Sequence, residues 1–235
     1  MKRSEINEHI VQAKVFAKKM HMALPPFAFW TTEQWAKKGD ECNEIRHLML
    51  GWDVTDFGLG NYKKTGRTLF TLRNGSLSYG IYPRSYSEKF IFIEENQAAP
   101  VHFHRNKTED IINRGGGNIL VQASKTASDG SRSDENFELS INGIRTKLKP
   151  MEIIRLKPGE SILIPAGTIH EFWSEEGTGI TLSGEIGTIC DDINDNVFLN
   201  PCKRFCEIEE DEPPLHYLCN EYPSSFNYKK QGVTL

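Results

Sequence analysis

The sequence predicts a mainly β protein, a sandwich or a small barrel, with helices confined to the first fifth of its 235 residues. From about Ile45, short runs rich in Leu, Phe, Ile, Tyr and Thr alternate with glycine-containing segments, which is typical of strands joined by turns. Asn-Gly pairs at residues 74–75 and 142–143 stand between such runs, and this dipeptide is a strong hairpin signal. Between Val101 and Ser183 no convincing helix interrupts the strands.

The first 44 residues are expected to form a helical arm packed on the β region. Apolar residues recur there at helical spacing: Ile6, Ile10, Ala13, Ala17 and Met20. They predict an amphipathic helix that opens near Ser4 and stops before the Pro25-Pro26 pair. A short second helix is predicted over residues 31–39, with Thr31 as N-cap, Gln34 at the capping-box position and Gly39 just past the end.

Residues 45–190 are expected to form the barrel, and residues 191–235 a C-terminal extension wrapped over it, all within one structural domain. A polar loop at residues 124–136 divides the β region without resembling a domain boundary. After Cys190 the chain becomes irregular, acidic and proline-containing, most clearly at residues 207–217. No internal repeat is visible.

Charge and cysteine content favour a cytoplasmic protein that acts on small molecules. Lys and Arg total 28 against 32 Asp and Glu, and no block of five like charges suggests a nucleic-acid arm or a membrane-binding segment. No apolar run reaches the ~20 residues that span a bilayer, and the N-terminus lacks the uninterrupted apolar core of a signal peptide. Five cysteines without a Cys-x-x-Cys pair indicate reduced thiols.

Two segments gather residues of the types that bind metals. Residues two apart on a strand share a face, so His102 and His104 can bind one ion. A His-x-His pair alone, however, is more often solvated or hydrogen-bonded. Glu109 follows after a short turn and can return on the neighbouring strand. In residues 158–173 a strand, a Pro-x-Gly turn and a third histidine, His170, follow one another.

Together the two segments resemble the paired motifs of the cupin superfamily. The first motif is matched by His102, His104, Glu109 and Gly116, and the second by Gly159, Pro165, Gly167 and His170. Two positions depart from the pattern: Asn96 replaces an opening glycine, a mild change because Asn tolerates a left-handed backbone, and Ser174 replaces a closing asparagine. The resemblance implies a cupin barrel, that is, a double-stranded β-helix or jelly roll.

All four cupin ligand positions, His102, His104, Glu109 and His170, keep metal-binding side chains. Three nitrogens and a carboxylate without a thiolate fit a divalent first-row ion: manganese, iron, cobalt, nickel or zinc. Octahedral coordination would leave two adjacent positions open, which suits a substrate that chelates through neighbouring oxygens.

Further charged residues lie close to these motifs. Lys107 points inward with Glu109 if the strand has already begun, and it would then need a carboxylate or a substrate oxygen beside it; the alternative is a solvent-facing lysine in the turn. Glu185 interrupts an apolar strand that should run along the barrel wall next to the metal strand. Asp192 and Arg204 follow in the C-terminal segment.

The 102–117 stretch, the N-terminal arm and the C-terminal segment resemble the cupin-type D-lyxose isomerases over nearly the whole chain. The resemblance implies reversible conversion of D-lyxose to D-xylulose and of D-mannose to D-fructose through a cis-enediol, with a divalent metal, usually manganese, in a homodimer. On this hypothesis Glu185 carries a proton between C2 and C1 while Lys107 assists it or steadies the enediolate oxygen. Asp192 and Arg204 would bind sugar hydroxyls.

Two alternatives remain open from the sequence. The same four ligands serve mononuclear iron cupin dioxygenases, which need dioxygen, whereas an isomerase would turn over a sugar anaerobically. A non-catalytic cupin that binds a metal or a sugar would need neither Lys107 nor Glu185 near the ion, and would not exchange the hydrogen at C2.

Overall fold

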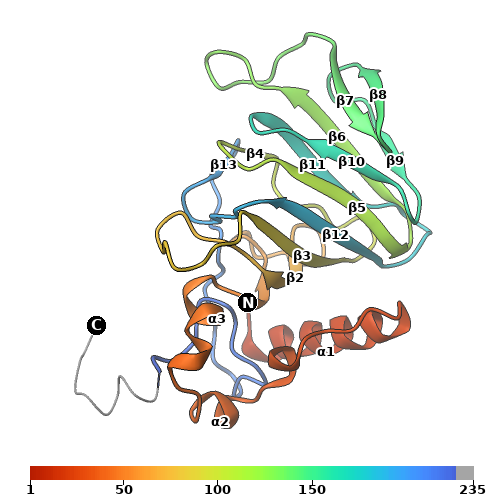
Figure 1. The fold of residues 1–235 in the computed structure, drawn as a ribbon. Helices are drawn as coiled ribbons and strands as arrows, with labels where there is room; N and C mark the ends of the chain where they lie inside the picture. The colour runs from red at the N-terminus through yellow and green to blue at the C-terminus, as the bar shows by residue number, and fades with distance from the viewer. Residues whose placement is uncertain (226–235) are drawn as a thin grey trace.

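Two antiparallel sheets face each other and form a barrel, with the helices gathered at one side (Figure 1). The computed structural model describes residues 1–225. The larger sheet has the strand order β1-β2-β3-β12-β5-β10-β7-β8, and the smaller one β13-β4-β11-β6-β9. The strands are β1 (Gly51–Thr55), β2 (Arg67–Arg73), β3 (Tyr86–Ile93), β4 (His102–His104), β5 (Glu109–Gly116), β6 (Ile119–Lys125), β7 (Phe137–Ile141), β8 (Ile144–Leu148), β9 (Ile154–Leu156), β10 (Ser161–Ile164), β11 (Thr168–Ser174), β12 (Thr181–Thr188) and β13 (Asn196–Phe198).

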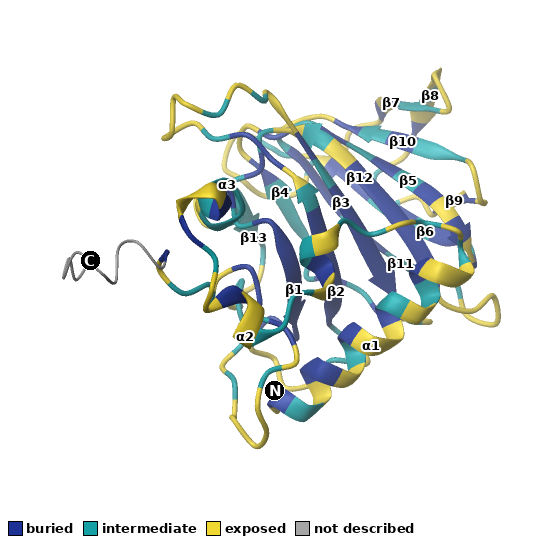
Figure 2. Ribbon diagram, turned by 60° about the horizontal axis from the view of Figure 1, so that its bottom comes forward, coloured by how far each residue is buried: buried dark blue, intermediate teal, exposed yellow. Residues whose placement is uncertain are grey.

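Most residues in the central strands of the larger sheet are buried (Figure 2), and two groups of apolar side chains pack against this sheet, one on each face. One core lies within the barrel and includes Leu69, Ile91, Ile111, Val121 and Phe172. A second core lies where the N-terminal helix α1 (Arg3–Lys19) meets strands β1 to β3 and β12, and contains Ile6, Ile10, Trp52, Phe70 and Leu182. Strands buried on both faces explain why their sequences show apolar runs more often than strict alternation.

The predicted helices form, with one difference in length. Helix α1 confirms the N-terminal amphipathic helix, and the capping box of Thr31 and Gln34 is present at the start of α2 (Thr32–Trp35). However, α2 ends three residues earlier than predicted, because the N–H groups of residues 37 and 38 bond three residues back and tighten the chain into a turn. Gly39, with φ −92°, is not a left-handed C-cap. Three further short helices are η1 (Pro26–Phe29), η2 (Asp40–Cys42) and α3 (Asn43–His47).

The two Asn-Gly pairs behave differently. Asn142 and Gly143, with φ of 52° and 78°, form the predicted two-residue hairpin between β7 and β8. The prediction of a tight hairpin at Asn74-Gly75 is wrong, since β2 and β3 pair across a loop of residues 74–85. There the Asn74 amide donates to the Cys190 carbonyl (2.8 Å) and its oxygen accepts from the Cys190 N–H (3.0 Å). A long-range contact has replaced the local turn.

Strands β4 and β5 belong to opposite sheets, so Glu109 does not return on a hydrogen-bonded neighbour of the histidine strand. It faces the histidines from across the barrel. Asn96 has φ 58°, which confirms that it adopts the left-handed backbone expected of the glycine it replaces.

The chain after residue 190 contacts both the barrel and the N-terminal helix α1. Strand β13 extends the smaller sheet by pairing with β4, and Arg3 of α1 binds Glu210 (2.6 Å) and Glu221 (2.5 Å). The last ten residues of the expected extension lie outside the described residues. Within residues 1–225, no helix is both long and apolar enough to cross a membrane.

Candidate active site

Three histidines converge from adjacent strands of the smaller sheet. His102 and His170 are directly opposite each other on β4 and β11, and with His104 they offer nitrogen atoms that all lie within 4.8 Å of one another. Nδ1 of His102 donates to the Pro100 carbonyl (2.8 Å), and Nδ1 of His170 to the Thr168 carbonyl (2.9 Å). In the neutral form of either ring, Nε2 then carries no proton and its lone pair is available to a ligand.

Glu109 completes this group from the opposite sheet. Its Oε1 lies 3.1 Å from Nε2 of His170, and its Oε2 lies 3.5 Å from Nε2 of His104. The His170 Nε2 atom is buried without a hydrogen bond, which a cation beside it would correct, while Oε2 of Glu109 contacts the Lys107 ammonium. Burial, with the other two histidines beside it, lowers the pKa of His102 well below its ordinary value, so its ring is neutral as a metal ligand must be. The four residues fit a divalent ion.

Lys107 is buried and bridges two carboxylates. Its Nζ donates to Oε1 of Glu185 (2.5 Å) and contacts Oε2 of Glu109, and the residue is only 2% exposed. Burial alone would lower the pKa of Lys107, but Glu109 and Glu185 raise it well above its ordinary value. Burial would likewise raise the pKa of Glu109, whereas Lys107 and His104 hold it well below the ordinary range. Lys107 therefore points inward, and the alternative of a solvent-facing lysine in the turn is wrong.

Glu185 reaches the group from β12, which pairs with β5 so that Gly187 is opposite Glu109. On its other side, Glu185 is directly opposite Lys89 of β3, whose Nζ lies 3.8 Å from Oε1. Sequence reasoning missed Lys89. It shares a face with Ile91 on an apolar strand, and the argument that singled out Glu185 would also have found it.

Asp192 and Arg204 are paired at the edge of the same group. Nη2 of Arg204 lies 2.9 Å from Asp192 and 2.7 Å from Asp53, and Nζ of Lys89 lies 3.0 Å from Asp192. Burial would raise the pKa of Asp192, but Arg204 and Lys89 hold it well below its ordinary value. For Asp53, which sequence reasoning also missed, burial prevails over Arg204 and raises the pKa.

Asp195 is a third residue that the sequence did not single out. It is 5% exposed and accepts from the backbone N–H groups of Asn106 (2.8 Å) and Lys107 (3.0 Å), and its Oδ2 lies 3.8 Å from Nδ1 of His104. It therefore fixes the segment between two ligand-bearing strands. No local sequence signal indicates this contact, because 88 residues separate Asp195 from Lys107.

Seven of the eight residues predicted for the site line one small cavity of about 60 Å³: His102, His104, Lys107, Glu109, Glu185, Asp192 and Arg204. His170 is fully buried beside them. Phe57, Phe172 and Phe198 supply an apolar wall. The structure thus brings the predicted residues into one enclosed, charged group, while the role of each residue stays a prediction.

Comparisons with known proteins agree with this geometry. A family model described as D-lyxose isomerase matches residues 1–222. Two relatives named D-lyxose/D-mannose isomerase, from Escherichia coli O157:H7 and Serratia proteamaculans, are 44% and 42% identical over 223 residues, covering 94% of this chain and 98% of each relative.

Solved structures of similar fold include L-ribose isomerases. That of Cellulomonas parahominis has a TM-score of 0.58 at 14% identity, covering 89% of this chain and 98% of its own. That of Acinetobacter sp. DL28 in complex with L-ribose has a TM-score of 0.60 at 14% identity, with the same coverage. At this identity the likeness concerns the fold, and the predicted cupin-type barrel is confirmed.

Proposed function

Since this chain belongs to the D-lyxose isomerase family, we propose that it interconverts D-lyxose with D-xylulose and D-mannose with D-fructose. It is an aldose–ketose isomerase. The two aldoses share their configuration from C2 to C4, and in the pyranose form D-mannose differs by a hydroxymethyl group on C5, so a single site that recognises C1 to C4 can accept both.

The observation that carries the proposal is the Lys107–Glu185 pair beside the histidine and glutamate group. Aldose–ketose isomerisation needs a proton to leave C2 and arrive at C1 while negative charge builds on the adjacent oxygens. A divalent cation held by His102, His104, Glu109 and His170 would supply Lewis-acid stabilisation of that charge. A non-catalytic sugar-binding module would need no buried lysine and second carboxylate at this place.

Glu185 is proposed to move the proton. Its carboxylate can take the hydrogen from C2 and return it to C1, because it is held in place by Lys107 at 2.5 Å and is flanked by Lys89 at 3.8 Å. Lys107 is proposed to steady the enediolate oxygen or assist the transfer. Asp192 and Arg204 are proposed to bind hydroxyls farther along the sugar.

We propose manganese as the ion in the cell, with zinc, iron, cobalt or nickel as alternatives. The donor set of imidazoles and one carboxylate suits all of these ions, and the family resemblance favours manganese. Metal analysis of the protein as purified, followed by stripping and reconstitution with each ion, tests the choice. Highest turnover with an ion other than manganese would contradict it.

A homodimer in the cytoplasm is proposed as the working form. Five free cysteines support a reducing compartment, and the family resemblance supports the dimer. Sedimentation equilibrium of the full chain measures the first point, and a monomer at micromolar concentration would refute it. Fractionation of the source cells measures the second.

The test of the activity is NMR of metal-loaded protein with D-lyxose and with D-mannose in oxygen-free heavy water. Ketose that carries deuterium at C1 would support isomerisation by proton transfer. Ketose without deuterium would indicate a hydride shift or a proton shielded from solvent. Absence of ketose from both sugars would refute the proposed function, and turnover only with oxygen would revive the dioxygenase alternative.

A further inference from the structure

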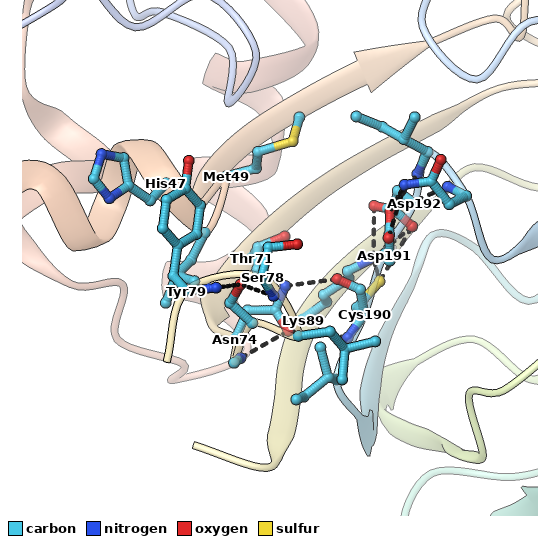
Figure 3. Close-up of a pocket in the computed structure, with 17 residues that line it drawn as sticks. His47, Met49, Thr71, Asn74, Ser78, Tyr79, Lys89, Cys190, Asp191 and Asp192 are labelled. Carbon is cyan, nitrogen blue, oxygen red and sulfur yellow. Dashed lines mark hydrogen bonds and ion pairs between the residues drawn. The ribbon is translucent and has the colours of Figure 1, made fainter. Parts of the chain in front are cut away.

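A second cavity adjoins the metal-binding one, and it has no role in the chemistry above. It measures about 210 Å³ and lies between the 74–85 loop, the end of α3 and residues 189–194. Figure 3 shows His47 and Tyr79 on one side of it, and Cys190, Asp191 and Asp192 on the other. Lys89 and Asp192 line both cavities, so their ion pair, with Nζ and Oδ2 3.0 Å apart, is the wall between them.

The inner cavity is too small for the substrate on its own. A cavity of about 150 Å³ holds benzene, which has six non-hydrogen atoms, whereas a pentose has ten and the inner cavity measures only about 60 Å³. A sugar at the histidines must therefore extend beyond this cavity or displace part of its wall. The outer cavity is the larger space that shares this wall.

The segment that carries Asp192 is built to move while its ends stay fixed. Before it, the Cys190 backbone is held by the buried amide of Asn74 at 2.8 and 3.0 Å. After it, the buried Asp195 is held by the N–H groups of Asn106 and Lys107. Between these fixed points, Ile193 is 64% exposed, and the hydrogen bonds of Ile193 and Asn194 go to Asp191 within the same turn. Lys89, by contrast, is fixed in the middle of the large sheet.

We propose that the sugar reaches the metal site through the outer cavity, and that the turn of residues 191–194 is a lid whose inward group, Asp192, swings away from Lys89 to admit it. The ligand class is a neutral polyhydroxy compound. The lining offers carboxylate acceptors at Asp191 and Asp192, a hydroxyl at Ser76 and an aromatic face at Tyr79, which are the groups that bind sugars.

When Asp192 moves away, Arg204 keeps its ion pair with Asp53 (2.7 Å) and Lys89 keeps Glu185 beside it (3.8 Å). Sugar hydroxyls can replace the contacts that both cations lose with Asp192, so opening leaves no buried charge without a partner.

This inference rests on the proposed function for the identity of the sugar, and the test separates the two. Ser78→Trp and Asn194→Trp fill the outer cavity from opposite sides, and both residues are exposed and outside the proposed catalytic group. Ser78→Ala and Asn194→Ala are the matched controls. Three quantities are measured: kcat/KM for D-lyxose, manganese affinity by calorimetry, and the broadening by bound Mn²⁺ of NMR signals from D-arabinitol, the alditol of D-lyxose, which cannot isomerise.

Each tryptophan variant is expected to lower kcat/KM at least about tenfold and to reduce the broadening of D-arabinitol, with manganese affinity unchanged and both alanine controls near wild type. A tryptophan variant that is folded, binds manganese normally and equals wild type in both sugar measurements would overturn the inference. Two variants keep the test decisive if one of them fails to fold. If the wild type makes no ketose from D-lyxose, the proposed function fails, and the D-arabinitol comparison still decides the route.

Discussion

Replacement of Glu185 by glutamine isolates the proton carrier from the binding groups. In the wild-type protein, Lys107 Nζ lies 2.5 Å from the Glu185 carboxylate. Glutamine keeps the shape of the side chain and an oxygen that can accept from Lys107, but it cannot take up a proton from C2. General acid–base groups contribute about 10²- to 10⁴-fold, so kcat for D-lyxose should fall by that factor. Each tenfold step is about 1.4 kcal/mol, which places the added barrier at about 3 to 5 kcal/mol.

Binding should survive the change because Glu185 is not one of the four proposed ligands. Manganese affinity by calorimetry and D-arabinitol binding by NMR are expected near wild type, while deuterium exchange at C2 in heavy water is lost. Glu171→Gln is the matched control, since Glu171 neighbours His170 on β11 but alternation points it away from the cavity. Turnover of Glu185→Gln within about tenfold of wild type, with normal exchange at C2, would refute the assignment.

Three other perturbations test the site. His170→Ala should lower manganese affinity more than about a hundredfold by calorimetry, and a smaller effect would contradict its role as a ligand. Lys107→Met leaves two buried carboxylates without their cation, so urea unfolding of the metal-free protein at pH 7 should show a loss of about 3 to 5 kcal/mol; an unchanged midpoint would contradict the bridging role. Asp195→Asn should weaken manganese binding about 10- to 100-fold through the 105–107 segment, whereas Asp191→Asn should not.

The pH dependence of stability has a definite sign at Asp192. Because its pKa is lower in the folded protein than the ordinary 3.8, its contribution is present above that value and is lost as the pH falls through the folded pKa. Metal-free wild type should therefore lose stability below about pH 4 more steeply than Asp192→Asn does. Equal slopes in acid unfolding curves would contradict the ion pairs with Lys89 and Arg204.

Some local features of the fold can be predicted from residues that are close together in the sequence, and others cannot. The Thr31–Gln34 capping box and the Asn142-Gly143 hairpin depend on residues within a few positions of one another, and both form as the sequence predicts. Asn74-Gly75 carries the same hairpin signal, but its amide binds Cys190, 116 residues away, and a longer loop results. The preference of Asn-Gly for a tight turn is overridden where a distant residue provides the hydrogen bonds that a buried polar group needs.

The sequence by itself predicted the proposed metal ligands, because a two-residue period puts His102 and His104 on one face and the resemblance to the cupin motifs adds Glu109 and His170. It also marked Glu185 as a charge in an apolar strand. Only the tertiary structure decided that Glu109 faces the histidines from the opposite sheet, that Lys107 lies between two carboxylates, and that other residues complete the charge network: Asp53, Lys89 and Asp195. These contacts join strands far apart in the chain, and a buried charge is stable only where folding brings its partner to it.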